Sequence, residues 1–303
     1  MLDAIQIDKI ARDEAQYYRG YDETLLDGEV LLHVRNNRTK ILSSNLPNKG
    51  LLNRCHPLLV LINKIDIGLV DFKIVLSLRD SYHERYSEVP RLVFSKNKWS
   101  NSILFPTTAS IDSYHSLEHT VERFDVKFEK KIDKVCFAGT STGVYLDNFT
   151  NGTRFKYALC TQRDDNFISY LSPEGPEKYR LAIEHGLKQE NQIRIPIKEQ
   201  LKYKYLINID GHATSYDRPI WQMLSNSLCI RIREPRGNFV EWFYGLMDCQ
   251  PEISLEDIGP YYKFLNNNQK YTENLAKKQT EFRKKLIDIK TTEEYIRQLF
   301  KNI

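Results

Sequence analysis

The stretch that decides the fold occupies residues 202–246 and reads KYKYLINIDGHATSYDRPIWQMLSNSLCIRIREPRGNFVEWFYGL. Within it, Tyr205–Ile209 is an apolar run of strand length that ends at once in Asp210-Gly211. Small residues follow, and such a run after a glycine indicates a sharp turn or a close approach of backbone to a ligand. This stretch therefore predicts a buried strand that delivers a turn to the edge of a sheet.

A helix and a second strand complete this unit. Pro219 favours the first position of a helix, with Asp217 or Ser215 as its cap, and residues 228–232 form the next apolar run. Strand, turn, helix and strand make a βαβ unit, in which both strands end at the same edge of a parallel sheet. The turn places free N–H groups and Arg218 at that edge, where phosphates bind.

A second glycine-containing turn lies in residues 134–143, KVCFAGTSTG. Here an apolar strand leads into Gly139, Thr140, Ser141 and Thr142, whose N–H groups and hydroxyls suit a phosphate at close range. The spacing is not that of a Walker loop, and no Gly-Lys-Thr follows. A polar turn without a ligand at the end of a strand is the alternative.

Composition and charge bound the classes of function. The 303 residues suggest two domains of about 150 each. With 44 basic and 40 acidic residues, the net charge of +4 creates no global field for nucleic acid or an anionic membrane, whereas a local anion pocket fits it. Aromatic residues make up 12% of the chain, which suits sugar-stacking surfaces as well as ordinary packing.

The cysteines and the N-terminal residues indicate the compartment. The five cysteines are odd in number and lack C-x-x-C spacing, so we predict thiols in a reducing compartment. Charges interrupt the first 18 residues, and we find neither a signal-like segment nor a membrane span. A cytoplasmic protein is expected.

Periodicity predicts further elements: a helix over residues 4–18, strands over 29–34 and 40–43 around a turn at Asn36-Asn37, a helix over 58–65 opened by Pro57, a strand over 72–78, and helices over 271–287 and 295–300. The strand over 72–78 ends in Arg79-Asp80. In a doubly wound sheet that end is the ligand edge.

Together these segments resemble glycosyltransferase family 90, the capsule-associated-protein-like and protein O-glucosyltransferase family. The likeness rests on Lys204–Gly211, on Ser215 with an arginine nearby, on Asn226-Ser-Leu228 after the helix, and on Glu241–Tyr244. It is the order and spacing of these residues that carry it, and weaker likeness extends over most of the chain.

The resemblance implies an α/β fold with two Rossmann-like domains facing a cleft, the GT-B architecture. Residues 1–133 would form the acceptor-side domain with the catalytic base, and residues 134–265 the nucleotide-sugar domain. Residues 266–303 would form C-terminal helices that pack back on the first domain.

The resemblance also implies a set of residues that bind the nucleotide sugar: Gly139, Thr140, Ser141, Thr142, Arg154, Gly211, Ser215, Arg218 and Glu241. Thr140 takes the family's small hydroxyl position, and Arg154 takes that of a downstream arginine. Glu241 would bind ribose hydroxyls, or else is a solvated glutamate in the first turn of a helix.

Two residues depart from the family pattern. Ala138 stands where an arginine is commoner, which removes one expected charge contact. Asp217 turns the usual Ser-x-Arg into Ser-x-x-Arg, which displaces Arg218 by one position.

Asp80 is the candidate for chemistry. It lies in residues 76–96, LSLRDSYHERYSEVPRLVFSK, which resemble the family's segment of an Arg-Asp pair followed by Val-Pro. The resemblance implies that Asp80 is the general base. The residues alone equally fit a loop aspartate that caps a turn or pairs with an arginine, and His83 and Glu84 are nearby alternatives.

The function that the resemblance implies is an inverting glycosyltransferase that moves a sugar from a UDP-sugar to a hydroxyl of a glycan or glycoprotein. UDP-xylose is favoured by analogy, and UDP-glucose is next. No two aspartates are spaced D-x-D, so we expect no metal and no other cofactor, with Arg154, Arg218 and helix N-termini neutralising the leaving group. The departures at Ala138 and Asp217 motivate the alternative, an inactive nucleotide-sugar or carbohydrate-binding protein.

Overall fold

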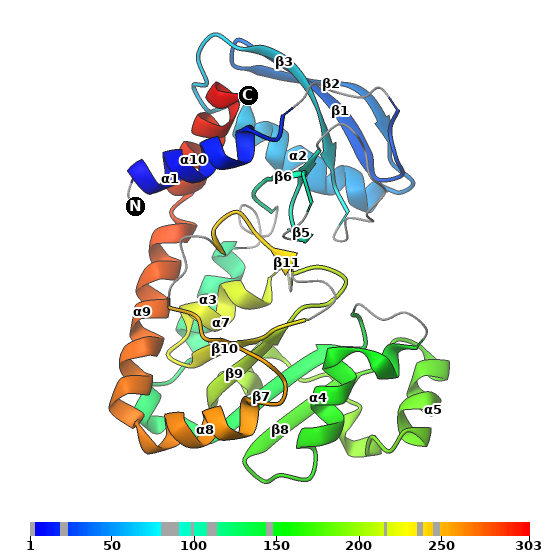
Figure 1. Ribbon diagram of the computed structural model, residues 1–303, viewed down its shortest axis with the longest axis vertical. Coiled ribbons are helices and arrows are strands. Elements are labelled where there is room, and N and C mark those ends of the chain that lie inside the picture. The colour runs from blue at the N-terminus through cyan, green and yellow to red at the C-terminus, as the bar shows by residue number, and fades with distance from the viewer. Residues whose placement is uncertain are drawn as a thin grey trace. The chain divides into compact units, whose positions relative to one another are not determined.

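The computed structural model describes residues 4–18, 24–79, 91–97, 100–107, 114–143, 148–214, 217–234, 239–244 and 249–303. It shows a mixed α/β protein with two five-stranded sheets (Figure 1). By compactness the chain divides into a first unit of Met1–Tyr114, Phe239–Met247 and Lys284–Ile303, and a second unit of His115–Asn238 and Asp248–Arg283. The expected division of roles at residues 133 and 265 stays a prediction.

The second unit is built on a sheet whose five strands are all parallel. Its strands are β7 (Ile132–Thr140), β8 (Phe167–Ser172), β9 (Tyr203–Ile209), β10 (Leu228–Ile232) and β12 (Glu252–Ile253), in the spatial order β12-β10-β9-β7-β8. In chain order this is 2-1-3-4-5, a doubly wound arrangement with its switch point between β7 and β9. The predicted strands and the parallel edge are confirmed.

Alternation of side chains explains the burial of β9. Tyr205, Ile207 and Ile209 belong to the hydrophobic core of this unit, whereas Asn208 and Asp210, which are equally buried, point to the opposite face. Both faces are covered because helices connect parallel strands on either side. A strand buried on both faces reads as the continuous apolar run seen in the sequence.

The helices that lie mostly or wholly in the second unit are α3 (Tyr114–Phe124), α4 (Thr153–Thr161), α5 (Pro176–Glu184), α6 (Ile197–Gln200), α7 (Arg218–Leu224), α8 (Ile258–Asn267) and α9 (Gln269–Ile287). Helix α7 begins at Arg218, one residue before the predicted first position at Pro219, which lies in its first turn. Asp217 occupies the cap position, although its side chain makes no capping hydrogen bond. Ser215, the other predicted cap, lies outside the described residues.

The first unit contains a mixed sheet. Its strands are β1 (Glu29–Arg35), β2 (Arg38–Asn45), β3 (Asp71–Ser77), β4 (Leu92–Val93) and β6 (Ile103–Leu104), in the order β2-β1-β3-β4-β6. Strand β1 is antiparallel to both β2 and β3. Asn36 and Asn37, with φ of 46° and 64°, form the predicted tight hairpin turn between β1 and β2. Only the second unit therefore has a wholly parallel sheet.

The remaining elements of the first unit are a two-stranded antiparallel ribbon of β5 (Lys96–Asn97) and β11 (Phe239–Val240), and the helices α1 (Ala4–Ala15), α2 (Lys49–Ile62) and α10 (Ile289–Asn302). Helix α1 packs along α10 (Figure 1). None of the helices among the described residues combines the length and the apolar character that a membrane crossing requires.

Two predicted helix starts are wrong. Pro57 lies inside α2, which begins at Lys49 and is capped by Asn48, whose Oδ1 accepts from the Leu51 N–H at 3.1 Å. Helix α10 begins at Ile289 rather than near Tyr295, and Asp288 caps it by accepting from the Lys290 N–H at 3.1 Å. In both helices a capping side chain lies upstream of the predicted start, at Asn48 before Pro57 and at Asp288 before residue 295.

Candidate functional site

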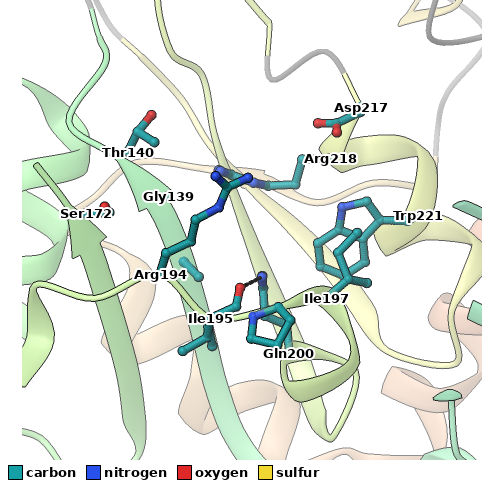
Figure 2. Close-up of a pocket in the computed structure, with 12 residues that line it drawn as sticks. Gly139, Thr140, Ser172, Arg194, Ile195, Ile197, Gln200, Asp217, Arg218 and Trp221 are labelled. Carbon is teal, nitrogen blue, oxygen red and sulfur yellow. Dashed lines mark hydrogen bonds between the residues drawn. The ribbon is translucent and has the colours of Figure 1, made fainter. Parts of the chain in front are cut away.

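A pocket of about 260 Å³ lies in the second unit at the carboxyl ends of β7 and β8 (Figure 2). It is lined by Ala138, Gly139, Thr140, Ser172, Arg194, Ile195, Pro196, Ile197, Gln200, Asp217, Arg218 and Trp221. This is the edge of the sheet at which doubly wound domains bind ligands. The predicted anion edge therefore coincides with a cavity.

Two arginines reach into this pocket from different elements. Arg218 is the first residue of α7, and Arg194 lies in the segment that precedes α6. Figure 2 shows the two side chains extending toward one another across the pocket. Asp217 is the acidic member of the lining set, and its charge partly offsets that of the neighbouring Arg218. The pocket is therefore electropositive.

Arg218 is held in a partly desolvated position. Its guanidinium carbon lies 5.6 Å from the centre of the Phe137 ring, a cation–π arrangement. Its Nη1 atom is buried and, among the described residues, has no hydrogen-bond partner. Burial accordingly lowers the pKa of Arg218 from its ordinary value. A desolvated cation with an unused donor is suited to bind an anion.

Gly139 makes room for this arginine. A Cβ atom at this position would lie 2.9 Å from Phe137 Cζ and 3.1 Å from Arg218 Nη2. Both distances are shorter than an ordinary van der Waals contact. The sequence placed this glycine in a phosphate turn, whereas the structure has it among the last residues of β7, where it allows Arg218 to lie over Phe137.

Arg154 joins the ends of β7 and β9, the two strands of the switch point. Its Nε and Nη2 donate to the Ile209 carbonyl at 3.1 and 2.8 Å. Its Nη1 donates to Thr142 Oγ1 at 2.6 Å and to the Thr140 carbonyl at 3.3 Å. Burial, and next the charge of Arg218, lower the pKa of Arg154. The residue thus fixes the separation of the two turns beside the pocket.

Gly211 packs against this arginine. A Cβ atom here would lie 2.9 Å from Thr142 Oγ1 and 3.1 Å from Arg154 Nη2. The Gly211 N–H donates to the Ala213 carbonyl at 2.8 Å, which closes a tight turn after β9. The turn after β9 and the turn after β7 therefore meet through Thr142, Arg154 and Gly211.

Comparison with known proteins identifies the family. Residues 52–303 match the family described as Glycosyl transferase family 90. The chain belongs to this family. It is also similar to the uncharacterized protein 179R of Invertebrate iridescent virus 6, with 26% identity over 140 residues, which cover 40% of this chain and 11% of that protein. The chain thus spans about a tenth of the length of that relative.

In this member of family 90, the turn after β7 divides into two parts. Gly139 and Thr140 line the pocket. Ser141 is buried and binds the end of β8, because its N–H donates to the Ser172 carbonyl at 3.2 Å and its Oγ accepts from the Glu174 N–H at 3.0 Å. Thr142 accepts from Arg154, as described above.

A buried ion pair between β10 and the end of β9 lies beside the carboxyl edge of this sheet. Arg231 Nη2 on β10 donates to Asp210 Oδ2 at 2.6 Å, and its Nη1 donates to Glu252 Oε2 at 2.9 Å. Asp210 is fully buried, and this burial raises its pKa although Arg231 opposes the shift. The pair fixes the start of the turn that contains Gly211.

Other predicted residues lie elsewhere. Asp80 and Ser215 fall outside the described residues, as do the alternatives His83 and Glu84, and their roles stay predictions. Glu241 belongs to the first unit, where it is buried in a turn after β11 whose Tyr244 N–H donates to the Glu241 carbonyl at 3.0 Å. Its ribose role also stays a prediction.

The sequence analysis missed the pocket residues that precede or lie within helices. Arg194, Gln200 and Trp221 all line the cavity, and Gln200 Nε2 donates to the Ile195 carbonyl at 3.1 Å. Arg194 lies in a stretch of mixed polarity that has no motif. Its place at the sheet edge depends on tertiary packing, which no local pattern in the sequence reports.

Proposed function

We propose that the protein is an inverting, metal-independent glycosyltransferase that transfers a sugar from a UDP-sugar to a hydroxyl of a glycan or glycoprotein. Membership of family 90 supports sugar transfer. The observation that carries the donor assignment is the pocket at the switch point, which Arg218 and Arg194 make electropositive. The GT-B arrangement of two domains facing a cleft is part of this proposal.

Arg218 is the proposed contact for the diphosphate. Its planar guanidinium can donate two parallel hydrogen bonds to a phosphate, and its buried Nη1 has a donor available for one of them. The hydroxyl of Thr140 and the apolar side chains of Ile195 and Ile197 complete the walls. At about 260 Å³ the pocket is slightly smaller than the roughly 300–1,000 Å³ typical of ligand sites, so part of the donor would extend beyond it.

Asp80 is the proposed base. It removes the proton of the acceptor hydroxyl while that oxygen forms a bond to the anomeric carbon of the sugar. The bond from the same carbon to the diphosphate oxygen breaks on the opposite side, which inverts the anomeric configuration. UDP departs with the bonding electron pair, and the arginines stabilise the charge that develops on it.

The test is a UDP-release assay with UDP-xylose and UDP-glucose, each with candidate glycans and with or without EDTA. We expect release of UDP together with a glycosylated product, equally with and without EDTA, and we favour xylose. If the purified protein neither transfers nor hydrolyses any UDP-sugar, the proposed activity is wrong. Loss of the activity in EDTA would contradict only the metal-independent mechanism.

A binding protein without catalysis is the second candidate. Ala138, which stands where the family more commonly has an arginine, lines the pocket, so one charge is absent from the wall of the site itself. This candidate predicts that UDP raises the melting temperature while UDP-xylose and UDP-glucose remain intact. Turnover in the release assay would exclude it.

The close packing at Gly139 leads to a further prediction. Gly139→Ala should displace Arg218 or the Phe137 ring, because the added Cβ would lie 2.9 Å from Phe137 Cζ and 3.1 Å from Arg218 Nη2. We expect this displacement of Arg218 to weaken UDP binding, measured by calorimetry, roughly fivefold, which corresponds to an overpacking cost of about 1 kcal/mol. Gly259→Ala is the control, because a Cβ there meets no atom within 4 Å. Unchanged UDP affinity in Gly139→Ala would show that this packing does not position the anion contact.

A further inference from the structure

Arg194 enters the pocket from a segment that carries no family motif. Its side chain is exposed and lies between the 3-10 helix Gln189–Asn191 and α6. The backbone that follows is anchored, because the buried Gln200 donates from Nε2 to the Ile195 carbonyl at 3.1 Å. The backbone beside Arg194 is therefore anchored, whereas its exposed side chain can move.

The two arginines differ in how firmly they are held. Arg218 is packed over Phe137 and has a buried nitrogen atom, whereas Arg194 is exposed and forms no ion pair within the described parts of the chain. Figure 2 shows them extending toward one another, with Asp217 beside Arg218 as the acidic residue of the lining. Two guanidinium groups and one carboxylate leave the wall of the cavity with a net positive charge, which an anion between the two arginines would neutralise.

This arrangement should depend on the charge of the ligand. An anion with more negative charge and more oxygen atoms can bind both guanidinium groups, whereas a smaller anion can satisfy the firmly held Arg218 alone. A nucleoside diphosphate and a nucleoside monophosphate differ in this respect while sharing the same base and ribose. The mobile arginine is therefore the one that can distinguish them.

We propose that Arg194 is a specificity-determining residue, which closes with Arg218 on the diphosphate of the donor and makes the pocket select nucleoside diphosphates over nucleoside monophosphates. This inference rests on the proposed function of the pocket. It adds a third arginine to the two that the family resemblance implies, and it assigns that arginine a role in selectivity.

The test compares wild type, Arg194→Ala and Arg194→Lys by calorimetry with UDP, UMP and inorganic pyrophosphate at one salt concentration. Lys198→Ala is the matched control, because Lys198 is an exposed cation on α6 that does not line the pocket. We expect Arg194→Ala to weaken UDP and pyrophosphate binding by about three- to tenfold and UMP binding much less. Arg194→Lys should be intermediate, since it keeps the charge but loses the planar fork.

The outcomes separate this inference from the proposed function. If Arg194→Ala weakens UDP and UMP equally, or neither, Arg194 does not select the diphosphate, although the pocket still binds UDP. If UDP weakens but pyrophosphate does not, Arg194 contacts the nucleoside and the inference is wrong. If the wild-type protein binds no UDP at all, the proposed function fails as well.

Discussion

Replacing Asp80 by asparagine is expected to lower turnover by about 10²–10⁴, the usual contribution of a general base. Asparagine keeps the size of the side chain and can still form hydrogen bonds, but its amide cannot take up the proton of the acceptor hydroxyl. Binding of the UDP-sugar should survive, because the donor pocket proposed above is formed by other residues. Rates at saturating UDP-sugar, together with calorimetry for the donor, measure the two effects separately.

The opposite outcome is equally informative. Were Asp80 a cap of a turn, asparagine would replace it well, because both residues cap turns and helices. Activity within a few-fold of wild type would therefore end the assignment of Asp80 as the base. His83→Asn and Glu84→Gln are the matched variants, and a large loss of turnover in one of them would move the role to that residue.

The second unit could be predicted in some detail from the sequence because its central strands are buried on both faces along most of their length. Strands β7, β9 and β10 appear as continuous apolar runs that end in glycine turns or charged residues. Such runs are typical of parallel sheets, and the edge at which they end fixes the place of a ligand. Gly139 and Arg218 were found in this way, and both line the pocket.

The errors have a different physical origin. A proline signals the start of a helix only when nothing upstream starts it earlier, and Asn48 does so for α2. Pro57 then lies within the helix. The helix residues before and after it, Cys55, Leu58 and Leu61, are buried. Local preference was overridden here by tertiary packing.

The pocket residues that the sequence did not predict also depend on tertiary structure. Arg194 and Trp221 are far apart in sequence, and no spacing rule connects them. They line one cavity because the segment before β9 and the helix after it both reach the carboxyl end of β7. A sequence motif reports residues that follow one strand, whereas a pocket also collects residues from the segments that cross over it.

The second large effect is expected at Arg218. Arg218→Ala should weaken binding of UDP and of UDP-sugars together, by about ten- to a hundredfold, because each lost charge-assisted contact is worth roughly 1.5–3 kcal/mol. Arg218→Lys keeps the charge but cannot donate two parallel hydrogen bonds, so its affinity for UDP should lie between those of wild type and Arg218→Ala. Arg163→Ala, at an exposed arginine that does not line the pocket, is the control for a general loss of charge.

The stability of the same variant shows whether this arginine is kept for binding or for folding. Burial lowers the pKa of Arg218, so the charged form is less favourable in the fold than in the unfolded chain, and at neutral pH its charge subtracts from stability. We therefore expect Arg218→Ala without ligand to melt at or above the wild-type temperature, and to lose most of the stabilisation by UDP. A strongly lowered melting temperature would mark Arg218 as a structural residue that packs on Phe137. Unchanged UDP affinity would show that Arg218 does not reach the phosphates, which would leave Arg194 and Arg154 to neutralise them.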